Sequence, residues 1–76
     1  MRISIIVPTL DEQECITGTL RNLQQLEGEK EIIVVDGGSR DETRSLARMQ
    51  EVEVLTSPPG RGMQMHVGAL KATGDV

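Results

Sequence analysis

The segment at residues 32–39, IIVVDGGS, constrains the fold of this chain more than any other. Four β-branched residues run directly into an acid, two glycines and a serine. A continuous apolar run of this kind is typical of a strand buried on both faces, as in a parallel sheet. The acid, Asp36, then lies at the carboxyl end of the strand, which is the edge where ligands bind in open α/β sheets. The segment therefore predicts both an architecture and a site.

The rest of the chain offers little material to cover such a strand. It has 76 residues, no Phe, Tyr or Trp, and 37% hydrophobic residues. A domain of this size is marginally stable, and without aromatic side chains its core has to come from Ile, Val, Leu and Met. The length allows one small domain or part of a larger one.

Charge and cysteine content exclude several classes of protein. The net charge of −4 does not favour nucleic acid, which needs clustered Lys and Arg. The single cysteine, Cys15, cannot form an internal disulfide, which fits the cytoplasm. Cys15 is interpreted as a small packed residue rather than a nucleophile. The apolar run at the start is too short for a signal peptide, and no stretch approaches the ~20 apolar residues of a membrane helix.

Apolar periodicity predicts alternating strands and helices. Strands are expected at residues 3–7, ended by Pro8, at 31–35 and at 52–55, and a fourth is expected to begin at residue 75. Helices are expected between residues 11 and 28, from 39 to about 50, and from about 63 to 72. This order predicts a Rossmann-like, three-layer α/β/α fold with a parallel sheet, three strands and three helices.

The helix boundaries rest on capping signals. Asp11 and Ser39 are predicted N-caps, each followed three residues later by Glu, and Gly28 and Gly74 are predicted to end helices. The faces predicted to be buried carry Ile16, Leu20 and Leu23 in the first helix, Leu46, Ala47 and Met49 in the second, and Met63, Val67 and Leu70 in the third.

Two common phosphate-binding loops are absent from the sequence. The turn after the first strand lacks the glycines of the dinucleotide fingerprint, and no Gly-Lys-Ser/Thr follows a strand. Asp36 can still bind a nucleotide, because a carboxylate accepts the N–H groups of uracil, thymine or guanine and is repelled by N3 of cytosine. Alternatively, Asp36 caps the turn or the helix at Ser39, and the spacing does not choose between these roles.

Three blocks in order, IIVPTLDE at residues 5–12, EIIVVDGGSRDET at 31–43 and GRGMQMHVGA at 60–69, resemble the family 2 glycosyltransferases of the GT-A fold. The resemblance covers essentially the whole chain. It implies inverting transfer from a nucleotide-diphospho-sugar, with a UDP-sugar as the favoured donor, to an unknown acceptor, with a divalent metal, Mg²⁺ or Mn²⁺. His66 stands where a similar bacterial branch has Asn, and Asp11 where Asn is often found.

The resemblance also implies roles for residues of the donor site. Pro8, Thr9 and Glu12 would line the nucleoside pocket, Asp36 would read the uracil edge, and Arg61 would contact the base or the diphosphate. Independently of the resemblance, Gly37 and Gly38 permit either a tight turn or the close approach of a ligand, and Gly38 is included among the donor-site residues. The alternative for Glu12 is that it stabilises the first turn of a helix, and the alternative for Arg61 is a solvated loop charge. His66 is interpreted as a solvated helix residue, and Met63, Gln64 and Met65 as packing and helix-face residues.

In this family the metal-binding acidic motif and the general base follow the part that resembles residues 1–76. The chain is therefore expected to be the N-terminal part of a GT-A domain, with no catalytic or metal-binding residue of its own, and inactive alone. A first strand without its fourth-strand neighbour would be an open apolar edge, which predicts self-association. The alternative is a non-catalytic nucleotide-binding or self-associating module.

Overall fold

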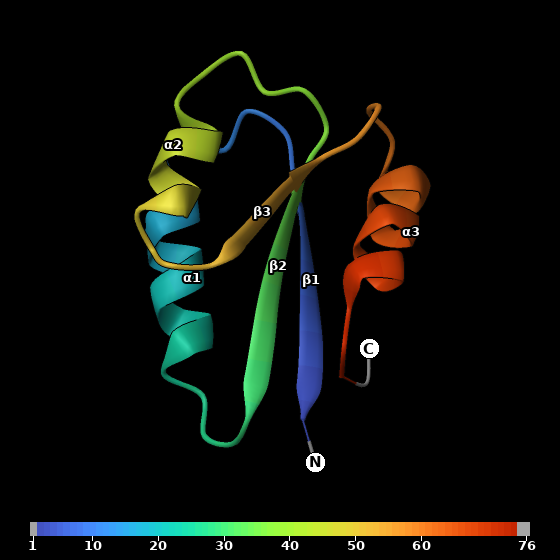
Figure 1. The fold of residues 1–76 in the computed structure, drawn as a ribbon. Helices are drawn as coiled ribbons and strands as arrows, with labels where there is room; N and C mark the ends of the chain where they lie inside the picture. The colour runs from blue at the N-terminus through green and yellow to red at the C-terminus, as the bar shows by residue number, and fades with distance from the viewer. Residues whose placement is uncertain (1, 75–76) are drawn as a thin grey trace.

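The computed structural model describes residues 2–74 and contains one sheet of three parallel strands (Figure 1). The strands are β1 (Ile3–Thr9), β2 (Lys30–Asp36) and β3 (Glu53–Thr56), in the order β1-β2-β3. Thr9 pairs with Asp36, and Asp36 pairs with Thr56, so all three strands end at one edge. The predicted parallel sheet is confirmed, and its second strand lies in the middle. The predicted fourth strand at residues 75–76 lies outside the described residues.

Helices cover both faces of the sheet. Helices α1 (Ile16–Gln24) and α2 (Thr43–Arg48) lie on one face, and α3 (Arg61–Lys71) lies on the other (Figure 1). This is the three-layer α/β/α arrangement that the sequence predicts. None of the helices in residues 2–74 has the length and hydrophobicity needed to cross a membrane.

The central strand β2 is buried on both faces, as its apolar run predicts. Ile32 and Val34 pack with Ile16, Leu20 and Ala47 in the core under α1 and α2. The two alternate residues, Ile33 and Val35, are fully buried as well. Because successive strand side chains point to opposite faces, these two lie under α3.

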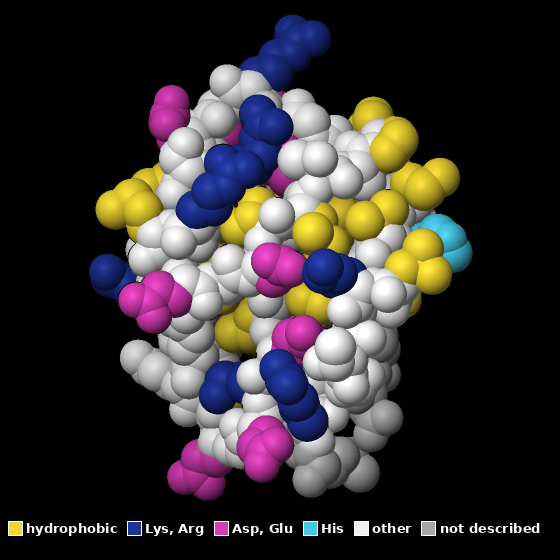
Figure 2. Space-filling model, in the orientation of Figure 1, with side chains coloured by type: hydrophobic (Ala, Val, Ile, Leu, Met, Phe, Trp, Pro, Cys, Tyr) yellow, Lys and Arg dark blue, Asp and Glu magenta, His cyan; other side chains and the backbone are white. Residues whose placement is uncertain are grey.

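The third helix buries a different face from the predicted one. Gln64 and Gly68 are its buried residues. Of the predicted residues, Val67 is half-buried, whereas Met63 is 48% exposed and Leu70 is 75% exposed. At Gly68 a Cβ atom would lie 2.5 Å from Cγ2 of Ile6, so the glycine lets the helix approach the sheet. The prediction failed because a glycine and an amide, not the apolar side chains, make the contact. Figure 2 shows hydrophobic side chains at the surface on the α3 side.

The predicted N-caps are wrong. Helix α1 begins at Ile16 rather than after Asp11, and α2 begins at Thr43 rather than after Ser39. Neither helix has a side-chain hydrogen bond from its N-cap residue. Asp11 adopts a φ of 51°, and both predicted capping side chains bond to a neighbouring loop instead.

The predicted C-terminal glycines also lie away from the helix ends. Helix α1 ends at Gln24, and Gly28, with a φ of 100°, lies in the connection to β2. Helix α3 ends at Lys71, and Gly74 lies against the carbonyl oxygen of Arg2. The β1 strand continues through Pro8 to Thr9, which a proline permits because β1 pairs on one side only among the strands of residues 2–74.

Candidate functional site

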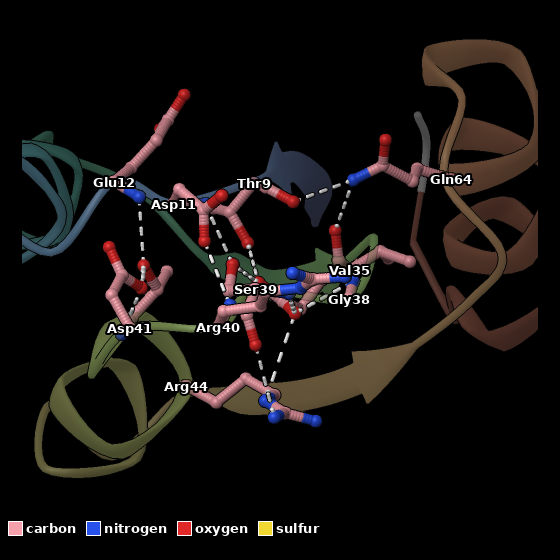
Figure 3. A network of polar contacts seen from close by, with 12 residues as sticks. Thr9, Asp11, Glu12, Val35, Gly38, Ser39, Arg40, Asp41, Arg44 and Gln64 are labelled. Carbon is pink, nitrogen blue, oxygen red and sulfur yellow. Dashed lines mark hydrogen bonds and ion pairs between the residues drawn. The ribbon is translucent and has the colours of Figure 1, made fainter.

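The carboxyl ends of β1 and β2 meet in a buried polar contact. Thr9 and Asp36 are paired in the sheet and are 1% and 0% exposed. The hydroxyl of Thr9 donates to Oδ1 of Asp36 over 2.9 Å (Figure 3). The backbone continues the contact, because the N–H of Gly37 donates to the carbonyl of Thr9 over 2.9 Å. The two strands predicted to form the site are therefore joined at their ends.

Asp36 also caps the turn that follows β2. Its Oδ2 accepts the N–H of Gly38 over 3.0 Å and that of Ser39 over 2.7 Å, and its Oδ1 accepts the hydroxyl of Ser39. With the bond from Thr9, four donors occupy the roughly four acceptor positions of a carboxylate. This is the capping role that the sequence left open. A contact between Asp36 and a nucleobase stays a prediction, and it would require one of these bonds to be given up.

The environment of Asp36 keeps it ionised. Burial alone would raise its pKa, but the hydrogen bonds from Ser39, Thr9 and Gly38 outweigh burial and lower the pKa below its ordinary value of 3.8. The guanidinium of Arg44 lies 3.7 Å from Oδ2 and also donates to the carbonyl of Ser39 over 3.3 Å. The buried carboxylate is thus a charged anchor for the turn.

Two reciprocal bonds join the loop after β1 to the loop after β2. The N–H of Asp11 donates to the hydroxyl oxygen of Ser39, and the N–H of Arg40 donates to Oδ1 of Asp11, both over 2.8 Å. The hydrogen bonds run from the buried Asp36 to Ser39, from Ser39 to Asp11, and from Asp11 to the exposed Arg40 (Figure 3). The edge of the sheet is therefore built from both loops together.

A second set of contacts fastens the same loops farther out. The N–H of Glu12 donates to the hydroxyl of Thr43 over 2.8 Å, and Asp41 accepts the N–H groups of Gln13 and Thr43 over 3.2 and 2.9 Å. The hydroxyl of Thr43 donates to Asp41 as well, and the side chain of Gln13 accepts the N–H of Glu42. A hydrogen bond from the Thr43 hydroxyl is the main cause of the lowered pKa of Asp41.

Helix α3 closes the site from the other face of the sheet. The side-chain amide of Gln64, which is 5% exposed, donates to the carbonyls of Thr9 and Val35, each over 2.9 Å (Figure 3). The prediction of Gln64 as a packing residue is confirmed in that it is buried. Its position across the ends of β1 and β2 is what the sequence did not reveal.

The predicted donor-site residues divide into a buried and an exposed set. Thr9 and Asp36 form the buried floor, and Pro8 is half-buried beside them. Glu12 and Gly38 are exposed on the two joined loops, and Arg61 is exposed as the first residue of α3. The structure thus brings the residues of the two loops together at the carboxyl edge of the sheet. Arg61 comes from a third segment, because α3 begins after β3.

Sequence reasoning missed Arg44 and Gln64. Arg44 lies in the first turn of α2, where the positive end of the helix dipole disfavours a cation, and this is the signal by which its acidic partner could have been sought. Gln64 gave no such signal, because it lies outside the face of α3 that the apolar spacing predicts to be buried. His66 and Cys15 are exposed, and Cys15 is a free cysteine rather than a packed one.

The other surface features of residues 2–74 do not indicate a catalytic or metal-binding site. A pocket of about 390 Å³ lies at the opposite, amino end of the strands, where its lining includes Arg2, Lys30 and Glu53. Among residues 2–74, no three His, Cys, Asp or Glu side chains are grouped so that they could hold a metal ion. The described residues therefore do not fit the divalent metal of the resembled family.

Comparison with curated proteins finds glycosyltransferases. An uncharacterized glycosyltransferase of Mycobacterium bovis is 31% identical over 72 residues, which are 93% of this chain and 32% of the relative. An uncharacterized protein of Methanocaldococcus jannaschii is 41% identical over 61 residues, 80% of this chain and 25% of that protein. The chain thus spans about a quarter to a third of the length of these relatives.

Solved structures share the fold. Glucosyl-3-phosphoglycerate synthase of Mycobacterium tuberculosis, crystallised with Mn²⁺, UDP-glucose and glycerol 3-phosphate, matches with a TM-score of 0.84 and 27% identity. The match covers 97% of this chain and 31% of the synthase. The same synthase crystallised with UDP matches equally well, with a TM-score of 0.84 and 27% identity.

The family itself follows from the extent of the family-model match. The model of "Glycosyl transferase family 2" matches residues 4–76, which takes in both joined loops, the buried floor and all of α3. The chain therefore belongs to glycosyl transferase family 2.

Proposed function

We propose that this chain binds the nucleotide of a UDP-sugar at the carboxyl edge of its sheet, as part of an inverting glycosyltransferase. One observation carries the proposal: the buried Thr9–Asp36 contact fastens two exposed loops at that edge, in a fold that superposes on a synthase crystallised with UDP-glucose. The donor sugar and the acceptor are left open, because a fold does not fix a substrate. A cytoplasmic location accompanies the proposal, supported by the single cysteine.

The exposed and buried residues receive different roles in this proposal. Glu12, Gly38 and Arg61 are exposed and contact the nucleotide, the guanidinium of Arg61 pairing with the diphosphate. Thr9 and Asp36 hold the loops in place beneath it, with Pro8 beside them. In this assignment all six predicted residues have a role at the site, but only the solvent-exposed ones contact the nucleotide directly.

The metal and the general base belong elsewhere in the proposed enzyme. A divalent metal, Mg²⁺ or Mn²⁺, would neutralise the leaving diphosphate when bound. Residues 2–74 offer it no ligand cluster, so these 76 residues are proposed to be the N-terminal, donor-binding part of a GT-A domain and inactive alone.

A second candidate is a non-catalytic nucleotide-binding or self-associating module. The observation that favours it is the edge of β1, which pairs with β2 alone among the described strands. A second copy could add a strand there. Transfer of sugar by the whole enzyme would separate the two candidates.

The proposal is tested by titrating the isotope-labelled protein with UDP and following backbone amide signals. We expect shifts at Glu12, Gly38 and Arg61. Arg61→Ala should weaken UDP binding by about tenfold or more, because a charge-assisted hydrogen bond is worth about 1.5–3 kcal/mol. Arg21→Ala, a change of the same kind in the last turn of α1, should leave binding unchanged. Absence of shifts at the carboxyl edge would refute the proposal, and turnover of UDP-glucose with Mn²⁺ would refute inactivity.

A further inference from the structure

The side-chain amide of Gln64 is held in one orientation. Its Nε2 donates to the carbonyls of Thr9 and Val35. Both partners are carbonyl oxygens, which only accept hydrogen bonds, so the nitrogen and not the oxygen must face them. The Oε1 atom is therefore fixed on the opposite side of the amide, and Figure 3 shows it pointing away from the strand ends.

This oxygen has no donor within the described chain. No residue between 2 and 74 donates a hydrogen bond to Oε1 of Gln64, although the residue is only 5% exposed. In the same part of the chain, every fully buried side-chain nitrogen or oxygen has a partner. Oε1 must therefore belong to the small part of Gln64 that solvent reaches. It is a fixed acceptor that a ligand can use.

The amide lies over Gly37, directly after Asp36. A Cβ atom at Gly37 would lie 3.1 Å from Cδ and Nε2 of Gln64 and 3.2 Å from Oε1. The missing side chain at position 37 thus leaves room for the amide. Asp36 itself has its acceptor positions filled by Thr9, Gly38 and Ser39. Of these two acceptors at the strand ends, only the amide oxygen of Gln64 is available.

We propose that Oε1 of Gln64 is the acceptor that reads the N3–H of uracil, a specificity-determining contact that the family resemblance implies for Asp36. The inference deepens the proposed function and rests on it. Cytosine presents a bare acceptor at N3 and would be repelled by the amide oxygen. Arg61, three residues earlier on the same helix and exposed, is then left to pair with the diphosphate.

The test compares UDP with N3-methyl-UDP, which lacks the donated hydrogen, in calorimetric titrations of three proteins. The wild type should bind N3-methyl-UDP about two- to tenfold more weakly than UDP, the range expected for one hydrogen bond. Gln64→Met, similar in size but without an acceptor, should lose most of this discrimination. Gln25→Met, an exposed glutamine after α1, should keep it.

This design separates reading of the base from packing. If Gln64 only clamps the strands, Gln64→Met weakens both ligands equally and the discrimination persists, which overturns the inference. The wild type alone also decides: its Gln64 side-chain signal should shift with UDP and not with N3-methyl-UDP, even if the variant fails to fold. Equal binding of both ligands by the wild type refutes the inference while leaving the proposed function standing. No binding of UDP refutes the proposed function itself.

Discussion

Asp36 shows how one buried residue can hold two loops together. Its carboxylate is fully buried and accepts the hydroxyls of Thr9, at the end of β1, and of Ser39, in the loop after β2. The hydroxyl oxygen of Ser39 in turn accepts the N–H of Asp11, in the loop after β1. A buried charge is tolerated only when its bonds are complete, and here they are. Removing the charge should therefore loosen both loops at once.

Folding stability should fall in acid because of this residue. The folded-state pKa of Asp36 lies below its ordinary value of 3.8, so its contribution is present above that value and is lost as the pH falls through the folded-state pKa. Glu31 and Asp41 act in the same direction, since their pKa values are lowered too, for Glu31 chiefly by a hydrogen bond from the N–H of Thr73. Urea unfolding at several pH values measures the effect.

The variant Asp36→Asn measures how much of this loss of stability in acid comes from Asp36. It should lower the free energy of unfolding at neutral pH by about 1–3 kcal/mol, because the amide nitrogen that replaces one carboxylate oxygen cannot accept the two hydrogen bonds that this oxygen receives, from Thr9 and Ser39 at Oδ1 or from Gly38 and Ser39 at Oδ2. Its stability should also depend less on pH in the acid range. Asp11→Asn, which changes an exposed carboxylate, is the control and should have a much smaller effect. Parallel pH curves for wild type and Asp36→Asn would contradict the assignment.

At the scale of the element, α3 depends on a small residue rather than an apolar stripe. Gly68 faces Ile6 and Val35, and Gln64 lies one turn earlier over the strand ends. The helix is therefore placed by a close backbone approach together with two hydrogen bonds. Its exposed Met63, Met65 and Leu70 play no part in that contact.

The substitution Gly68→Ala tests this placement. The added methyl group would lie 2.5 Å from Cγ2 of Ile6 and 3.1 Å from Cγ2 of Val35, which should cost about 1–3 kcal/mol of stability. The matched control is Gly18→Ala in α1, where nothing lies within 4 Å of the new atom. There the better helix propensity of alanine should stabilise the chain by about 0.5–1 kcal/mol. Thermal or urea unfolding that ranks the two variants the other way would contradict the packing.

At the scale of the whole molecule, one edge of the sheet has no partner among the described strands. Strand β1 pairs with β2 on one side only, and its first residue, Ile3, is 48% exposed. An apolar strand of this kind is a template for pairing with another strand. This chain spans about a quarter to a third of the length of its relatives, so the relatives have further residues that could pair with this edge.

The 76-residue chain should self-associate through this edge at about 100 µM, a concentration range in which open strand edges aggregate. Ile3→Lys should suppress the association, because a charge on an edge strand opposes pairing. Leu26→Lys, at a residue that is 54% exposed but outside the strands, should not. Light scattering with size exclusion measures the mass, and a wild-type monomer with a cooperative melt would contradict the prediction.

Strong local patterns predicted the fold correctly, whereas the capping motifs and the predicted buried face of α3 were wrong. The apolar run of β2 identified a central buried strand, and the alternation of strands and helices identified the parallel sheet. The side chains of Asp11 and Ser39 looked like helix caps, but they bond across the two loops. The local sequence shows which polar side chains need a hydrogen-bond partner, but it does not show which partner the fold brings within reach.

The sequence by itself determined the architecture and the family, and it indicated the edge of the sheet where we propose the site. These follow from periodicity and from motifs, which are local properties of the chain. Only the tertiary structure decided that Asp36 is a buried anchor and that the amide of Gln64, 55 residues from Thr9, lies across the strand ends. The physical reason is that hydrogen-bond partners are chosen by distance in space, and residues 9, 36 and 64 meet only once the sheet and α3 have packed.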